Sequence, residues 1–120
     1  MIGFTSSQRY YLSRQSADMR KSYDGLSGLV RQGLGRDPLS GEVFIFLNRR
    51  RTMVKLLVWD RSGFVLWSKR LERGTFELPR PLEQGASIVL AWEELVLILE
   101  GVSLGSVRRR VRYSRAQAAA

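Results

Sequence analysis

The chain has few of the side chains on which enzymes commonly depend. It contains no His and no Cys, which excludes Ser-His-Asp and Cys-His nucleophiles and zinc sites of the usual Cys/His kind. It also contains no glycine-rich phosphate-binding motif of the P-loop or dinucleotide type. Asp18, Asp24 and Asp60 could in principle form a two-metal site, but a helix cap, a polar helix position and a turn explain them more simply. We therefore expect no catalysis, no metal and no cofactor.

Arginine supplies the strongest chemical signal. Twenty Lys and Arg residues against eleven Asp and Glu residues leave a net charge of +9, and most of the twenty are Arg. The planar guanidinium of Arg matches phosphate oxygens with two parallel hydrogen bonds. This excess favours a nucleic acid as the partner, with an acidic protein surface or a role in solubility as the alternatives.

The basic residues are concentrated in two regions. Between Glu42 and Arg70 bases outnumber acids, and the C-terminal tail, residues 106–120, has no acid at all. We expect this tail to be disordered without a partner. A further basic pair, Arg20 and Lys21, stands in the first turn of a predicted helix, where a phosphate contact could form. The residues expected to contact DNA are Arg20, Lys21, Arg49, Arg50, Arg51, Lys55, Lys69, Arg70, Arg108, Arg109, Arg110 and Arg112.

Three apolar runs between residues 42 and 71 predict a three-stranded antiparallel meander. Val43–Leu47, Met53–Trp59 and Phe64–Leu71 are rich in β-branched and aromatic residues, which pack well in sheets. The polar breaks between them are short enough for hairpins. In the second break we expect Gly63 to adopt positive φ.

The second of these strands has two different faces. Alternation places Val54, Leu56 and Val58 on one face, which we expect to be the core. Lys55, Leu57 and Trp59 share the other face with Met53. A cation beside an aromatic ring suits a binding surface, with Leu57 and Trp59 as partner contacts, but a solvated outer face is equally consistent.

Helical periodicity comes before the meander. Met19, Tyr23, Leu26, Val30 and Leu34 follow spacings of three and four, which predicts an amphipathic helix lying across the sheet. Ser16 or Asp18 could cap its start, and Gly35 and Pro38 mark its end. Gly25 and Gly28 could allow close approach to the sheet.

The remaining elements are shorter. We expect edge strands near Tyr10–Leu12 and Thr75–Leu78, a strand at Ser87–Leu90, and a helix from Trp92 to Gly101. Trp67 and Trp92 are expected in the core. The fold class is therefore α+β: an antiparallel meander of three or more strands, one long helix packed on it, and a second helix near the C-terminus. Residues 1–105 should form one domain.

Localisation follows from what the sequence lacks. No apolar run approaches the length needed to span a membrane, no secretory signal is visible, and there is no Cys for disulfides. A cytoplasmic protein with no membrane partner is expected.

Several blocks of sequence together resemble a known family. The blocks are Asp18–Leu26 (DMRKSYDGL), Asp37–Gly41 (DPLSG), Val43–Arg51 (VFIFLNRRR), Val54–Asp60 (VKLLVWD), Gly63-Phe64 and Lys69–Phe76 (KRLERGTF). Over roughly residues 8–101 the chain resembles the TnpB accessory proteins of bacterial insertion sequences, the Orf2-like proteins of the insertion-sequence family numbered sixty-six. Longer RNA-guided nucleases share the name TnpB but are unrelated.

This resemblance implies a small protein encoded beside a separate transposase and needed for transposition of the element. Within the matching blocks, the family motif falls on Asp18, Met19, Arg20, Lys21, Asp24, Gly25, Asn48, Arg49, Arg50, Lys55, Trp59, Asp60, Gly63, Lys69, Arg70, Leu71, Glu72 and Gly74. Ala17 stands where relatives often have Thr or Cys, and the segment 77–87 and the tail match least.

Two functional hypotheses follow from the sequence. The first is a non-enzymatic transposition accessory that binds DNA of the element ends through its basic residues. The second is a protein-interaction module that docks on the transposase, or on a second copy of itself, through the face of Lys55, Leu57 and Trp59.

Overall fold

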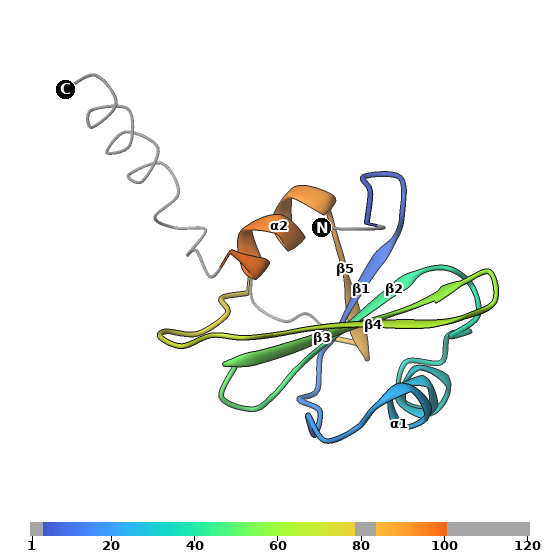
Figure 1. Ribbon diagram of the computed structural model, residues 1–120, viewed down its shortest axis with the longest axis horizontal. Helices are drawn as coiled ribbons and strands as arrows, with labels where there is room; N and C mark the ends of the chain where they lie inside the picture. Colours follow the sequence, from blue (N-terminus) through green and yellow to red (C-terminus); the bar gives the residue numbers. More distant parts are fainter. Residues whose placement is uncertain (1–3, 79–83, 101–120) are drawn as a thin grey trace.

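A five-stranded mixed sheet forms the centre of the protein, and a helical segment covers each of its faces (Figure 1). The computed structural model describes residues 4–78 and 84–100. The strands lie in the order β4-β3-β2-β1-β5. Their bounds are β1 Tyr10–Ser13, β2 Val43–Leu47, β3 Met53–Asp60, β4 Gly63–Arg70 and β5 Ser87–Leu90. The helical segments are α1 Tyr23–Gly28, the π-helical turn η1 Leu29–Gly33, and α2 Trp92–Leu99.

The predicted meander is confirmed as β2, β3 and β4. Each strand pairs antiparallel with the next, and the β3–β4 register runs without interruption from Met53 opposite Arg70 to Asp60 opposite Gly63. The hairpin turn differs from the prediction in one respect. Arg61, with φ of 49°, adopts the left-handed conformation that was expected of Gly63. The positive φ falls inside the two-residue loop rather than after it.

The sheet extends beyond the meander in a way that local patterns could not predict. β1 was expected at an edge, but it lies inside the sheet, parallel to β2 and antiparallel to β5. The predicted strand Ser87–Leu90 is confirmed as β5, which forms one edge. Thr75–Leu78 is not a strand. Instead, Phe76 is fully buried, and its N–H donates to the carbonyl of Arg51 at 2.7 Å.

One face of the sheet packs against α2. Val54, Leu56 and Val58 lie in this core as predicted, together with Leu95 and Ile98 of α2. Trp67 and Trp92 are partly buried and pack against the same cluster. At the start of α2, the carboxylate of Glu94 accepts from the N–H of Ala91 at 3.0 Å, which satisfies one of the free donors of the first turn.

The opposite face is covered by α1 and η1, so both faces of the sheet are cores. Leu26 and Val30 from the helical segment pack on Tyr11, Phe44 and Leu57. The sequence predicted that Leu57 of β3 contacts a partner. In the structure its side chain is fully buried, so it is not accessible to one. A regular alternation of side chains cannot reveal that both faces are covered.

The predicted long helix is wrong at its start and in its form. The chain is not helical until Tyr23, and Asp18 does not cap it: the N-cap is Ser22, without a side-chain cap bond. After one α-helical stretch the chain continues as a π-helical turn, and Gly35 follows with φ of 63°, as its predicted terminating position requires. Gly25 and Gly28 do not mediate approach to the sheet, because a Cβ on Gly25 would meet only Lys21 and one on Gly28 would meet nothing.

Candidate nucleic-acid interface

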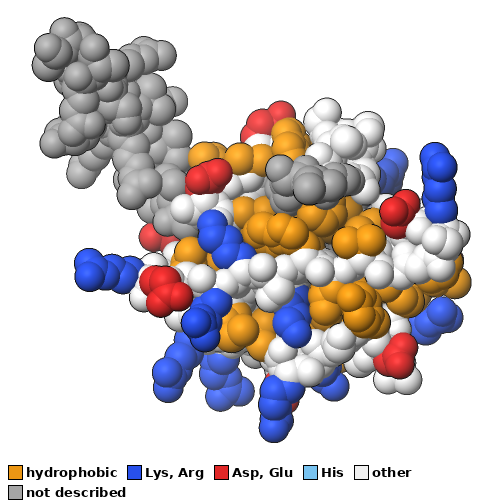
Figure 2. Space-filling model, in the orientation of Figure 1, with side chains coloured by type: hydrophobic (Ala, Val, Ile, Leu, Met, Phe, Trp, Pro, Cys, Tyr) orange, Lys and Arg blue, Asp and Glu red, His pale blue; other side chains and the backbone are white. Residues whose placement is uncertain are grey.

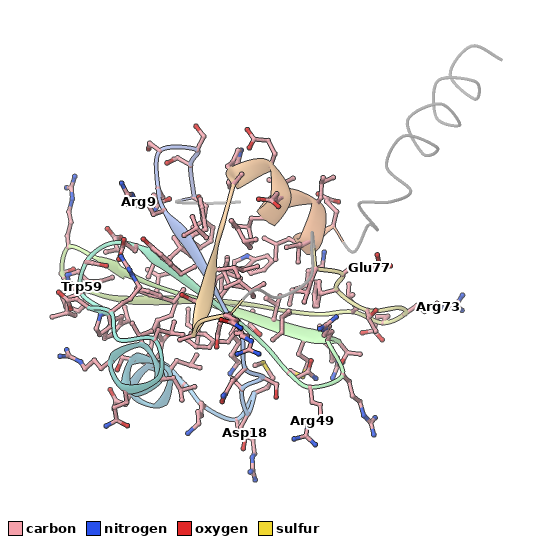
Figure 3. The ribbon with its side chains drawn as sticks, turned by 180° about the vertical axis from the view of Figure 1, so that it is seen from behind. Arg9, Asp18, Arg49, Trp59, Arg73 and Glu77 are labelled. Atoms are coloured by element: carbon pink, nitrogen blue, oxygen red, sulfur yellow. The ribbon has the colours of Figure 1, made fainter. Side chains whose placement is uncertain are left out.

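Several arginines gather at one end of the sheet. β1, β2 and β4 finish at this end and β3 begins there, because β1 and β2 run parallel while β3 runs antiparallel to both of its neighbours. Their connections carry exposed arginines. We call this surface the arginine end and define it by Arg14, Arg49, Arg50, Arg51, Arg70 and Arg73. In Figure 3 Arg49 and Arg73 lie at this end, and Arg9 and Trp59 lie at the other.

The turn from β2 to β3 is held in shape by Asn48. Its Oδ1 accepts from the backbone N–H groups of Thr52 at 2.9 Å and Met53 at 3.0 Å, and its Nδ2 donates to the Thr52 hydroxyl at 3.0 Å. The N–H of Arg51 donates to the Asn48 carbonyl at 3.0 Å. A fixed backbone therefore carries the three consecutive arginines, whose side chains remain exposed. Preorganised backbone lowers the entropy lost when such side chains engage a ligand.

Neighbouring segments are tied to this turn. The N–H of Leu71 donates to Thr52 and that of Phe76 to Arg51, which fixes the loop bearing Arg73. On the other side, the N–H of Ala17 donates to the carbonyl of Leu47. A small cleft lies between these parts, lined by Ser13, Arg14, Gln15, Ser16, Leu47, Asn48, Arg49, Arg51 and Leu78.

Sequence reasoning missed Arg14 and Arg73 as members of this surface. Arg14 is adjacent to the β2–β3 turn only because β1 pairs with β2, which is more than thirty positions away in the sequence. Nothing local to Arg14 indicates that neighbour. Arg73 lies in a predicted loop with Glu72, where charge alone did not distinguish it.

Most of these arginines have no acidic partner. Within the described residues, Arg14, Arg49, Arg50, Arg51 and Arg73 make no ion pair. The Arg70 guanidinium lies 3.6 Å from Glu72, with both side chains largely exposed. Such surface pairs contribute little, so a phosphate could replace Glu72. Figure 2 shows Lys and Arg side chains at the lower left of the molecule, where the β2–β3 turn and the loop after β4 lie in Figure 1.

Two of the three lysines predicted to contact DNA, Lys55 and Lys69, have structural roles. The half-buried Lys55 donates its ammonium to the carbonyl of Lys21 at 2.8 Å, which ties β3 to the segment before α1. Lys69 donates to the carbonyl of Leu99 at 2.6 Å, at the C-terminus of α2. A cation there satisfies a free carbonyl and complements the helix dipole. Neither ammonium projects freely into solvent.

Arg20 and Lys21 lie in an exposed turn rather than in the first turn of a helix. Asp18 accepts from the Arg20 backbone N–H at 2.9 Å and pairs with its guanidinium at 2.7 Å. Hydrogen bonds from the Arg20 side chain, and then from its backbone, lower the pKa of Asp18 to about 2 from its ordinary 3.8. The expected phosphate site at a helix N-terminus is therefore absent here, since α1 begins only at Tyr23.

Trp59 lies at the far end of the sheet from Arg49 (Figure 3). It is half-buried, with its ring edge-to-face against Phe64 at 5.1 Å. The partner surface predicted from Lys55, Leu57 and Trp59 is thus not a continuous exposed face: Lys55 is bonded, Leu57 is buried, and only Trp59 is partly accessible.

A second polar cluster has a structural explanation. The Arg36 guanidinium lies 3.9 Å over the ring of Tyr11 and binds the Glu42 carboxylate at 3.0 Å. Burial raises the pKa of Glu42, but hydrogen bonds from Arg36, Ser40 and Tyr11 outweigh it and leave the pKa lowered. The intervening DPLSG block is a turn, in which Asp37 accepts from the Leu39 N–H. This cluster fastens the turn between η1 and β2.

Among residues 4–78 and 84–100, no group of three carboxylates is placed to hold a metal ion. Asp24 lies in the first turn of α1, and Asp60 ends β3. Within the same residues, no helix is long and apolar enough to cross a membrane. The tail arginines Arg108, Arg109, Arg110 and Arg112 lie outside the described residues, as does Gly101, the predicted end of the second helix.

Comparisons with known proteins agree with the resemblance noted in the sequence. Two curated relatives come from Sinorhizobium fredii, both titled as uncharacterized proteins. The first, y4jC, is 34% identical over 110 residues, which cover 92% of each chain. The second, y4hO, is 31% identical over 94 residues, covering 78% of this chain and 80% of the relative. No solved structure matches the chain. The family model described as IS66 Orf2 like protein matches residues 8–109, and the chain belongs to this family of transposition-associated proteins.

Proposed function

We propose that the protein is a non-enzymatic accessory of insertion-sequence transposition that binds DNA of the element ends through the arginine end. The observation that carries this proposal is the convergence of six exposed arginines at one end of the sheet, from the residue after β1, the β2–β3 turn, the end of β4 and the loop after it. Guanidinium groups that lack acidic partners are suited to contact backbone phosphates, which supply most of the affinity in sequence-independent binding.

The shape of this surface favours contact with the backbone over reading of bases. The arginines stand on turns and loops, and no helix among the described residues projects from the arginine end into solvent. Sequence-specific reading usually requires a helix or a free two-stranded ribbon in the major groove. The β2–β3 hairpin is not a free ribbon, because β1 and β4 pair with its outer sides. The proposed role is therefore to hold or bridge DNA, while base recognition falls to the transposase.

The residue types of the chain support a non-enzymatic role. The chain has no His or Cys, and Asp18, Asp24 and Asp60 occupy a turn, a helix and a strand end with no shared site among the described residues. A phosphate-binding surface requires none of these groups to act as an acid, a base or a nucleophile.

The proposal is tested by binding a labelled duplex that carries an element end across a salt series. The test variant is Arg14→Gln/Arg49→Gln/Arg50→Gln. The control is Arg9→Gln/Arg31→Gln/Arg61→Gln, which removes the same charge from three exposed arginines outside the arginine end. Each phosphate contact contributes about −0.9 to the slope of log K against log salt, so the test variant should lose up to about 2.7 of that slope.

The control variant should keep most of both affinity and slope. Equal losses in both variants would mean that net charge, and not this surface, attracts the DNA. Unchanged binding in both would contradict the proposal and would favour docking on the transposase. The alternative contact is then Trp59, which Trp59→Ala would test by pull-down of transposase from nuclease-treated extract.

A further inference from the structure

The outer edge of β4 has no neighbour among the described residues, although it is the longest exposed edge of the sheet. β4 spans eight residues, whereas β5 at the other edge spans four. Alternate residues of an antiparallel strand direct their N–H and C=O groups away from the existing partner. On β4, those groups point away from β3, where no described strand pairs with them. Such an edge is a template for pairing with another strand.

The usual protection of an edge strand is weak on β4. Proteins blunt free edges with proline, with bulges or with charged side chains, especially lysine. The exposed charge of β4, Arg70, stands only at its last residue. The pairing of β4 with β3 has no bulge from Gly63 to Arg70, and the strand contains no proline. Its lysine, Lys69, has its ammonium bound to the carbonyl of Leu99. The protection that a mobile lysine gives is thus reduced.

Apolar side chains flank this edge on both faces of the sheet. Val65 is 44% exposed, and Trp67 beside it is only partly buried against the α2 core. On the α1 face, Phe64 and Leu66 are likewise only partly buried. Figure 2 shows apolar side chains along the middle of the viewed face, where β4 runs in Figure 1. A groove lined by Trp67, Lys69, Trp92, Val96, Leu99 and Glu100 adjoins the strand.

We propose that a second copy of this chain pairs with β4 in antiparallel orientation, so that two sheets join into one across a two-fold axis. The distribution of charge makes the strand compatible with a second copy of itself in this orientation. Its two cations, Lys69 and Arg70, stand at one end, and the other end, Gly63 and Phe64, is uncharged. Antiparallel self-pairing sets the basic end of each copy against the apolar end of the other. Parallel pairing would instead align like charges, which is destabilising.

The faces of the sheet restrict the register. Directly opposed residues of an antiparallel pair point to the same face, so a symmetric pair must be centred on a residue. If the two-fold axis passes through Trp67, Val65 lies opposite Lys69 of the other copy, and Phe64 lies opposite Arg70 of the other copy. In this register every residue from Phe64 to Arg70 is paired. The stems of both cations then cover apolar side chains, and Trp67 meets its symmetry mate. We therefore propose that the two β4 strands of the dimer pair in this register.

This dimer replaces the self-association surface expected from the sequence. That surface used Leu57, which is buried under α1 and η1, whereas the β4 edge leaves both helical layers undisturbed. The proposed contact shares only Arg70 with the arginine end, because Arg14, Arg73 and the β2–β3 arginines lie outside β4. Either proposal can fail alone.

The experiment uses two opposite charges at one exposed position. Sedimentation equilibrium of the full chain should give a mass near twice 13.7 kDa at high protein concentration. Val65→Lys places a cation opposite Lys69 of the partner and should weaken dimerisation by about tenfold or more, since like charges across an interface are strongly unfavourable. Val65→Glu should keep the dimer, because its carboxylate faces the same Lys69. Val89→Lys on β5 is the matched control and should leave dimerisation unchanged.

Amide hydrogen exchange provides an independent readout. Every second amide of β4 should gain protection as the protein concentration rises, and Val65→Lys should abolish that gain. A wild-type chain that remains monomeric at all concentrations would overturn the proposal. So would a dimer that persists in Val65→Lys, because the interface would then lie elsewhere. Loss of the dimer in both Val65 variants would overturn the register centred on Trp67.

Discussion

Arg51 has an unfavourable backbone conformation and also belongs to the proposed DNA-binding surface. Its replacement by glycine should therefore raise stability while weakening DNA binding. Its φ is 57°, in the left-handed region. For a residue with a Cβ this conformation costs about 1–2 kcal/mol. Glycine removes that cost but loses about 0.5–1 kcal/mol through the greater freedom of the unfolded chain. The difference between the midpoints of these two ranges predicts that Arg51→Gly raises the free energy of unfolding by about 0.75 kcal/mol.

The backbone contacts of Arg51 do not oppose this gain. Its N–H donates to Asn48 and its carbonyl accepts from Phe76, and glycine retains both groups. The Arg51 side chain is exposed and makes no ion pair within the described residues. No packing is therefore removed with it. The gain should raise the melting temperature by about 3–6 °C, at about 4–8 °C per kcal/mol for a domain of this size.

Arg50→Gly is the matched control. Arg50 lies in the same turn and is equally exposed, but its φ is not positive. Its replacement should therefore lower stability by about 0.5–1 kcal/mol. Both variants remove one cation from the arginine end, so each should reduce the salt slope of DNA binding by about 0.9. Urea unfolding with an unchanged m value reports the stability difference. Equal destabilisation in both variants would refute the reasoning from backbone conformation.

Two further predictions concern the core and its polar support. Leu57→Ala should lower the free energy of unfolding by about 2–5 kcal/mol, because the side chain is fully buried under α1 and η1. As a control, Leu39→Ala should change it by less than about 0.5 kcal/mol, because Leu39 is 44% exposed. A similarly small loss in Leu57→Ala would mean that Leu57 is a surface residue that can contact a partner. Glu42 has a lowered pKa when folded, so it stabilises the protein above its unfolded pKa near 4.5, and this contribution is lost as pH falls through the lower folded pKa. Unfolding measured between neutral and acidic pH should show a weaker acid dependence in Glu42→Gln, and an identical profile would contradict the assigned role of the Arg36 pair.

The helical segment before the meander shows where periodicity alone misleads. Met19 and Tyr23 stand four residues apart, as they would in a helix, but Asp18 forms a tight turn with Arg20 and the helix begins only at Tyr23. Aspartate competes for backbone N–H groups in turns as readily as at helix caps. The residue type alone could not decide between the two, whereas the glycine that ends the segment was correctly placed because positive φ strongly favours glycine.

The arginine end was predictable only in part. Arg49, Arg50 and Arg51 were identified because they lie consecutively in one break between strands, which is a local signal. Lys55 and Lys69 were assigned to the same surface by charge, yet their ammonium groups bind backbone carbonyls that are more than twenty-five residues away. Charge identifies a candidate for phosphate binding, but only the folded chain shows whether a carbonyl already holds it.

The sequence by itself determined the meander and the segment that forms β5, because both depend on short-range patterns of apolar residues and turns. It also determined the family, through the matching blocks of sequence. Tertiary structure alone decided that β1 lies between β2 and β5, that both sheet faces are buried, and that Arg14 joins the β2–β3 arginines. Strand pairing over long sequence separation and the covering of a second face depend on contacts between distant segments. A short stretch of sequence does not contain those contacts. Neighbouring residues determine the local conformation of a segment but not the distant segment against which it packs.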